Sequence, residues 1–142
     1  MIVFAGGCLE HIARAAERAY PEECCGLLIG RRDADGVLRI TEVAESANVA
    51  AAQRTRRFEV DPALRLSLMR RLRGTDNDIV GHYHSHPGGA AEPSAHDAAM
   101  MFEPELIWLI VAVAAGRAGE TRCWRWDPAA AGFRHAPHRL YE

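Results

Sequence analysis

The strongest constraint on the fold is a histidine-rich run that ends an apolar segment. Residues 79–84 (IVGHYH) are rich in apolar and β-forming side chains, and a Pro-Gly-Gly turn follows at residues 87–89. This composition predicts a buried strand. Side chains two positions apart on a strand lie on the same face, so His84 and His86 can converge on one point.

A second element begins shortly after this strand and carries a carboxylate. Ser94 opens it, and residues 98–101 (AAMM) continue it as a helix, so Asp97 lies in the first turn and can point back at the strand end. Ser94 and Asp97 also match a helix capping box, which needs no metal. Two imidazoles and a carboxylate are, however, the ligand set of a hydrolytic zinc that keeps one position open for water. We therefore predict one Zn²⁺ per chain, held by His84, His86 and Asp97.

The joint spacing His-x-His-x7-Ser-x2-Asp resembles that of the JAMM (MPN-plus) zinc metallopeptidase family, and the resemblance covers nearly the whole chain. In that family a glutamate lies upstream, in a segment of the type Pro-x-Glu-x-Cys-Gly-x-Leu-x-Gly. Residues 21–30 (PEECCGLLIG) match this segment and place the glutamate at Glu23. Asn48 and residues 58–62 (FEVDP) match further positions. The pattern is most similar to the short bacterial and archaeal members.

The resemblance implies a function and a division of roles. It implies a zinc-dependent peptidase or isopeptidase that cuts after the C-terminal Gly-Gly of a ubiquitin-like or sulfur-carrier protein. In that scheme Glu23 moves the proton as general base and then general acid, and Ser94 stabilises the oxyanion. His84, His86 and Asp97 hold the metal.

Two neighbouring residues compete with these assignments. Adjacent side chains on a strand point to opposite faces, so only one of Glu22 and Glu23 can reach the metal, and the family spacing selects Glu23. His82 shares a face with His86, but their Cα atoms are roughly 13 Å apart at about 3.3 Å per residue. We therefore expect His82 to be a core or supporting residue and not a ligand.

Other functions remain open at this point. An MPN-type scaffold would bind partners without cutting, although scaffold members typically lack the His and Asp set. A cell-wall peptide hydrolase is a further alternative. A zinc nucleoside deaminase would need a Pro-Cys-x-x-Cys motif, which this sequence lacks. The arginines of residues 54–57 belong either to a solvated loop or to a site for a substrate carboxylate. The carrier, the leaving group and the oligomeric state stay undetermined, with a homodimer among the alternatives.

Length and composition predict a single domain over residues 1–142. The net charge of −2 gives no indication of nucleic-acid binding. The apolar run at residues 106–115 is too short to cross a membrane, and no secretory signal is visible, so a cytoplasmic location is expected. The four cysteines form no Cys-x-x-Cys pair and are expected to be buried free thiols.

Strands and helices alternate along the chain, which predicts an α/β fold with a mixed β-sheet flanked by helices. The resemblance implies the same JAMM/MPN architecture, related to the cytidine deaminase fold. Helices are expected at residues 8–19 and from Pro62 to Gly74, where Leu64, Leu68, Met69 and Leu72 would form the buried stripe. Strands are expected at residues 2–4 (an edge), 24–30, 37–43, 78–86, 106–115, 123–126 and 133–140 (a last edge).

Overall fold

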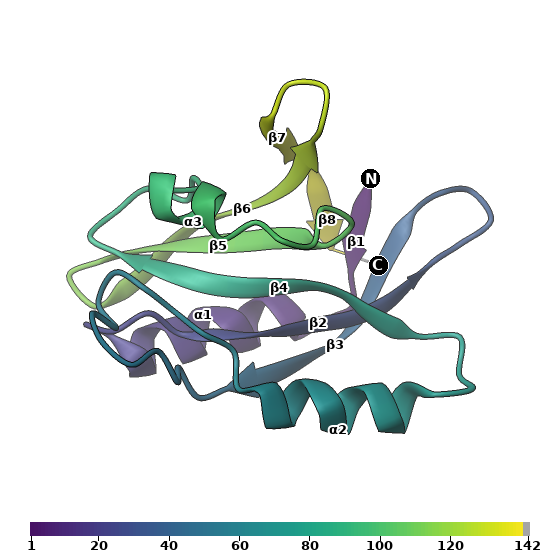
Figure 1. The fold of residues 1–142 in the computed structure, drawn as a ribbon, viewed down its shortest axis with the longest axis horizontal. Coiled ribbons are helices and arrows are strands. Elements are labelled where there is room, and N and C mark those ends of the chain that lie inside the picture. Colours follow the sequence, from purple (N-terminus) through teal and green to yellow (C-terminus); the bar gives the residue numbers. More distant parts are fainter. Residues whose placement is uncertain (141–142) are drawn as a thin grey trace.

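The computed structural model describes residues 1–140, and its strands form one eight-stranded mixed sheet flanked by helices (Figure 1). The strand order is β7-β6-β5-β4-β2-β3-β1-β8. The α/β prediction is confirmed, while residues 141–142 of the predicted domain lie outside the described residues. The elements are β1 (Ile2–Phe4), α1 (Cys8–Ala19), β2 (Cys25–Arg32), β3 (Leu38–Ser46), α2 (Pro62–Leu72), β4 (Asp78–Pro87), α3 (Ala95–Ala99), β5 (Ile107–Ala114), β6 (Arg117–Asp127), β7 (Gly132–Ala136) and β8 (His138–Leu140).

One face of the sheet is closed by α1 and holds the main core. The predicted amphipathic helix is confirmed, with Ile12 and Ala16 buried against the sheet. Phe4, Leu28 and Leu109, from three different strands, belong to the same buried cluster. Since their neighbours in sequence point to the other face, this core fixes which side chains are left for the opposite side of the sheet.

The opposite face is covered in part by α2. The helix begins as predicted, because the Asp61 side chain accepts a hydrogen bond from the Ala63 N–H at 2.9 Å and Pro62 occupies the first position. Leu68 and Leu72 pack into a second, smaller buried cluster. Met69 was predicted to join them but is 52% exposed, so that prediction is wrong. Adjacent helical residues are rotated by about 100°, which turns Met69 off the stripe.

The two predicted edge strands are placed differently from the expectation. β1 lies between β3 and β8 and is buried, so it is not an edge. Residues 133–140 were predicted as one strand but form β7 and β8, which lie at opposite ends of the strand order. Pro137 separates them, and it cannot donate a ladder hydrogen bond. Its carbonyl instead accepts from the Ile2 N–H at 3.3 Å.

β4 is a central strand, and its pairing on both sides fixes where its histidines lie. It pairs antiparallel with β2 and parallel with β5, so that His84 lies beside Cys25 and Ile110. Tyr83 belongs to the α1-side core, and a Cβ at Gly26 would lie only 2.3 Å from the Tyr83 ring. Alternation along β4 then directs the histidines to the opposite face. None of the helices within residues 1–140 is long and apolar enough to span a membrane.

Candidate active site

Three of the predicted site residues bring one donor atom each to a common point. The Nε2 atoms of His84 and His86 are 3.0 Å apart. Asp97 Oδ2 lies 3.2 Å from His84 Nε2 and 3.1 Å from His86 Nε2. His84 and Asp97 are buried, and His86 is largely buried at the mouth of the site.

His86 is oriented by a hydrogen bond from the far side of its ring. Its Nδ1 lies 2.9 Å from the carbonyl oxygen of Ala90, which can only accept, so Nδ1 carries the proton. In the neutral ring Nε2 therefore presents a lone pair to the common point. Burial opposes charging of His86, but its hydrogen bond with Asp97 and the Ala90 carbonyl raise its pKa above the usual value.

His84 is oriented by stacking instead. Its Nδ1 atom is buried and has no hydrogen-bond partner among the described residues. The Phe58 ring lies almost parallel to the imidazole, with centroids 4.3 Å apart and an interplanar angle of 16°. Trp108 contacts the same ring edge-on at 5.8 Å. Burial lowers the pKa of His84, although Asp97 opposes the shift, which favours the neutral ring.

Asp97 reaches the site from the first turn of α3. Ser94 and Asp97 form the predicted capping box: the Asp97 N–H donates to Ser94 Oγ at 3.0 Å, and the Ser94 N–H donates to Asp97 Oδ2 at 2.9 Å. Burial alone would raise the pKa of Asp97, but its hydrogen bonds with His84 and His86 hold that pKa well below its usual range. The helix was predicted to continue through residue 101, but it ends at Ala99, so that part of the prediction is wrong.

Glu23 lies beside the two histidines, just before β2. The donor atoms of Glu23, His84 and His86 all lie within 4.8 Å of one another. Glu23 is 4% exposed, and its Oε1 has no hydrogen-bond partner among residues 1–140, whereas Glu22 is exposed. Burial raises the pKa of Glu23 to about 8, with His86 opposing the shift and Asp97 adding to it. Of the two glutamates, the structure therefore brings only Glu23 into the site.

The backbone of Glu23 is tied to the loop at residues 47–60. The Glu23 N–H donates to the Arg54 carbonyl at 2.8 Å. The Asn48 amide donates to the carbonyls of Glu23 at 3.1 Å and of Arg57 at 2.9 Å. The same loop carries Phe58, so it helps to position both Glu23 and His84. Sequence reasoning matched Asn48 and Phe58 to a family pattern but gave neither of them a place in the site.

The donor set fits a zinc ion. Zinc bonds of about 2.0–2.2 Å in a tetrahedron separate neighbouring donors by about 3.3 Å. The three observed separations of 3.0, 3.1 and 3.2 Å are close to that value. Three lone pairs point to one place: one from each imidazole nitrogen and one from the carboxylate. His86 also carries its proton on the nitrogen away from this point, as metal-bound histidines do.

The other candidate side chains lie outside this donor set. His82 packs edge-on against Trp108 at 4.3 Å, and burial lowers its pKa to about 3, so it is a neutral supporting residue. His96 is only partly buried, and its side chain has no hydrogen bond or ion pair in the described chain. A cavity of about 210 Å³ lies beside Asp97 and is walled by Phe58, His82 and Trp108.

All four cysteines are buried free thiols, as predicted.

Known proteins are similar to this chain in sequence and in fold. Residues 7–127 match the family model for prokaryotic homologs of the JAB domain. A desampylase from Haloferax volcanii is 36% identical over 102 residues, which cover 72% of this chain and 70% of that protein. A CysO-cysteine peptidase from Mycobacterium tuberculosis is 29% identical over 111 residues, which cover 78% of this chain and 72% of that protein.

Two solved structures have a similar backbone. A protein from Desulfitobacterium hafniense superimposes with a TM-score of 0.84 at 29% identity, over 100% of this chain and 94% of that one. A JAB1/MPN domain protein from Archaeoglobus fulgidus gives a TM-score of 0.63 at 19% identity, over 98% of both chains, and supports the fold alone. The fold and motif agree with the predicted resemblance to short JAMM (MPN-plus) proteins. The chain belongs to the family of prokaryotic homologs of the JAB domain.

Proposed function

We propose that this protein is a zinc-dependent peptidase or isopeptidase that cuts after the C-terminal Gly-Gly of a ubiquitin-like or sulfur-carrier protein. The observation that carries the proposal is the convergence of His84, His86 and Asp97 beside the buried carboxyl of Glu23. The names of the two relatives, a desampylase and a CysO-cysteine peptidase, support a carrier protein as the substrate.

In this proposal, His84, His86 and Asp97 hold one Zn²⁺. When bound, the ion would supply Lewis-acid polarisation of the scissile carbonyl and activation of a water molecule. Asp97 adds the single negative charge of the ligand set, and its capping box with Ser94 keeps Oδ2 aimed at the histidines.

Glu23 would move the proton. Its Oε1 is buried without a partner, so it can accept a proton during attack on the carbonyl and deliver it to the leaving amine. Burial raises its pKa to about 8, and a carboxyl with a pKa near the working pH can both take and release a proton. Asn48 and Arg54 hold the Glu23 backbone and so fix where this carboxyl sits.

Ser94 would stabilise the developing oxyanion. Its Oγ accepts the Asp97 N–H, which leaves the hydroxyl proton free to be donated to the substrate oxygen. A Gly-Gly tail suits such a site, because residues without side chains let their backbone approach the metal closely. We also place the reaction in the cytoplasm, where thiols stay reduced, since the four cysteines are free.

The proton-transfer role is tested by Glu23→Gln, with Glu22→Gln as the matched control. The amide keeps the shape of the carboxylate but cannot take the proton, so Glu23→Gln should retain its zinc and lose turnover. Glu22→Gln should leave both unchanged, because Glu22 is exposed. Zinc content by metal analysis and cleavage rates on the same samples decide the matter, and the reverse pattern would contradict the assignment.

The substrate class is tested with two kinds of carrier conjugate. The zinc-loaded protein is incubated with a carrier extended by one residue beyond Gly-Gly, and separately with a carrier joined to a lysine side chain, and the products are read by mass. Cleavage after Gly-Gly is expected, and replacing the last glycine with a bulky residue should abolish it. If neither is cut, cell-wall peptides are the next substrate to try, and a non-catalytic binding role follows if those also stay intact.

A further inference from the structure

Ser85 lies between the two histidine donors on β4 but outside the donor set. It is fully buried, and alternation along the strand turns its side chain to the face opposite that of His84 and His86. Its Oγ accepts a hydrogen bond from the Cys24 N–H at 2.8 Å. Because a buried hydroxyl is unfavourable unless it is hydrogen-bonded, this contact is a specific link between β4 and the chain just before β2.

The link stands where the pairing of β2 with β4 ends. The last register pair is Cys25 with His84. One position further, the Ser85 N–H donates to the Cys24 carbonyl at 3.2 Å. In a regular antiparallel pair the Cys24 N–H would return to the Ser85 carbonyl, but here it donates to the Ser85 hydroxyl. A side chain thus replaces the ladder at the residue that follows Glu23.

The Cys24 N–H and the Glu23 carbonyl belong to one planar peptide unit. The Asn48 amide donates to that carbonyl at 3.1 Å, so the unit is held at its oxygen by the loop and at its nitrogen by β4. A planar unit that is held at both edges cannot turn about the chain, which fixes the backbone of Glu23 on its carboxyl side. The direction in which the Glu23 side chain leaves the backbone is therefore tied to the strand that carries the histidines.

The Glu23 carboxyl depends on this backbone support. Its Oε1 is buried and has no hydrogen-bond partner among residues 1–140, so no such bond orients that oxygen. A Glu23 carboxyl oxygen nevertheless lies within 4.8 Å of the donor atoms of His84 and His86. The backbone thus takes on the placement that a hydrogen bond to the side chain would otherwise provide.

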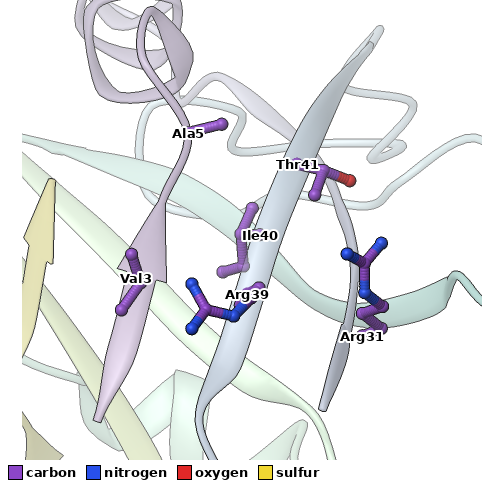
Figure 2. Close-up of a pocket in the computed structure, with 6 residues that line it drawn as sticks. All are labelled: Val3, Ala5, Arg31, Arg39, Ile40 and Thr41. Carbon is purple, nitrogen blue, oxygen red and sulfur yellow. The ribbon is translucent and has the colours of Figure 1, made fainter. Parts of the chain in front are cut away.

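A second hydroxyl contact on β2 lies far from the donors. The Thr41 hydroxyl of β3 donates to the Ile29 carbonyl at 3.4 Å. Figure 2 shows Thr41 on β3, with Arg31 on the neighbouring strand β2, among the residues that line a cavity of about 310 Å³. Ile29 is about 20 Å from Glu23 along the chain, at about 3.3 Å per residue. The two hydroxyls therefore make the same kind of contact to the same segment, and only one of them adjoins the glutamate.

We propose that Ser85 is a positioning residue for Glu23: its hydroxyl holds the peptide unit between Glu23 and Cys24 and so places the carboxyl beside the metal donors. This inference rests on the proposed role of Glu23 as the proton carrier. It gives β4 two tasks, because one face of the strand supplies the histidines and the other face supplies the hydroxyl that aligns the glutamate with them.

The test compares Ser85→Ala with the wild type, as the zinc-loaded full chain, on a carrier extended beyond Gly-Gly. Misplacement of a reacting group by about 1 Å can cost on the order of 100-fold in rate, so kcat should fall by about 10- to 100-fold. KM and zinc content should stay unchanged, since the buried Ser85 cannot touch the carrier and is not a ligand. Ser85→Thr keeps the hydroxyl and should restore kcat. Thr41→Val is the matched control and should leave kcat unchanged.

Amide exchange of Cys24, followed by NMR, reads the contact without any substrate. The Cys24 amide should exchange slowly in the wild type, and Ser85→Ala should accelerate this exchange by about tenfold, as expected for the loss of one hydrogen bond. Fast exchange in the wild type would overturn the proposal even if Ser85→Ala does not fold.

Four kinetic outcomes would also overturn it. They are an unchanged kcat in Ser85→Ala, an equal fall in Thr41→Val, loss of zinc from Ser85→Ala, and a folded Ser85→Thr that is as slow as Ser85→Ala. Loss of zinc would mean that Ser85 acts through the histidines and not through Glu23. If the wild type cuts no carrier, the proposed function fails, whereas the exchange of the Cys24 amide still decides whether Ser85 holds the peptide unit.

Discussion

The two sides of the metal-donor cluster are built in different ways. His84 and His86 come from β4, which is hydrogen-bonded to a neighbour on each side over most of its length. Asp97 and Ser94 come from the segment of residues 88–99, whose only regular element is the five-residue helix α3. One side is therefore set by continuous strand pairing, and the other by a few isolated hydrogen bonds.

Three isolated contacts hold the loop side. The Gly88 N–H donates to the Val113 carbonyl at 2.7 Å, and the Trp124 indole N–H donates to the Ala91 carbonyl at 3.0 Å. The capping box of Ser94 completes the set. The sheet therefore fixes the positions of the histidines, whereas a small number of contacts decides whether the side chains of Asp97 and Ser94 lie beside them. Removal of either histidine should remove the metal, whereas removal of the Ser94 hydroxyl should mainly alter geometry and rate.

The largest effect is expected for His86→Ala. Loss of one of three ligands should lower the affinity for zinc by more than about 100-fold, since even residues that only support metal ligands contribute about 10- to 100-fold. His96→Ala is the matched control, because His96 neighbours Asp97 on α3 but lies outside the donor set, and it should keep its zinc. Competition with a chelator measures both, and undiminished zinc in His86→Ala would remove the ligand assignment.

A smaller effect is expected for Ser94→Ala, which probes the loop side. If Ser94 stabilises the oxyanion, kcat should fall by about 100-fold. If it acts only as a helix cap, the protein should lose about 1 kcal/mol of stability with little kinetic change. Asp61→Ala is a control for pure capping, because Asp61 caps α2 away from the donors. Thermal melts and rates on the same samples separate the two roles.

The smallest effect is expected for Phe58→Leu, which removes the ring stacked on His84. Because no hydrogen bond orients His84 at Nδ1, we expect the affinity for zinc to fall by about tenfold, as for other supporting residues. Phe58→Tyr keeps the ring and should restore the affinity. Phe133→Leu is a matched control, because Phe133 packs edge-on against Trp108 and Trp126 but does not contact the ring of a ligand. Equal zinc affinity in all three variants would show that stacking does not position His84.

Much of the site could be predicted from the sequence because it depends on local spacing. The alternation of His84 and His86 on one strand face, and the first-turn position of Asp97, need only the geometry of a strand and a helix. The contact between Phe58 and His84 could not be predicted, because it joins a loop to a strand 26 positions later and depends on how that loop folds back.

The fold was predictable to the same degree and for the same reason. Buried strands and capped helices leave local patterns, and most of those elements lie near their expected positions. Two differ in length: β6 (Arg117–Asp127) is longer than the predicted strand at residues 123–126, and α3 ends at Ala99 instead of continuing through residue 101. The neighbours of a strand leave no such pattern, so residues 2–4 were taken for an edge although β1 lies inside the sheet.

The separation of β7 and β8 has a consequence for how the chain is made. A chain emerges from the ribosome N-terminus first, and a long unpaired strand edge is a template for aggregation. Until residues 132–140 have been synthesised, both ends of the sheet are open: β6 lacks β7, and β1 lacks β8. A single late ribbon, bent at Pro137, then adds the outermost strand at both ends and covers β6 and β1. Nascent chains shorter than this leave the edges of β6 and β1 exposed, and we expect them to depend more on chaperones than the full chain does.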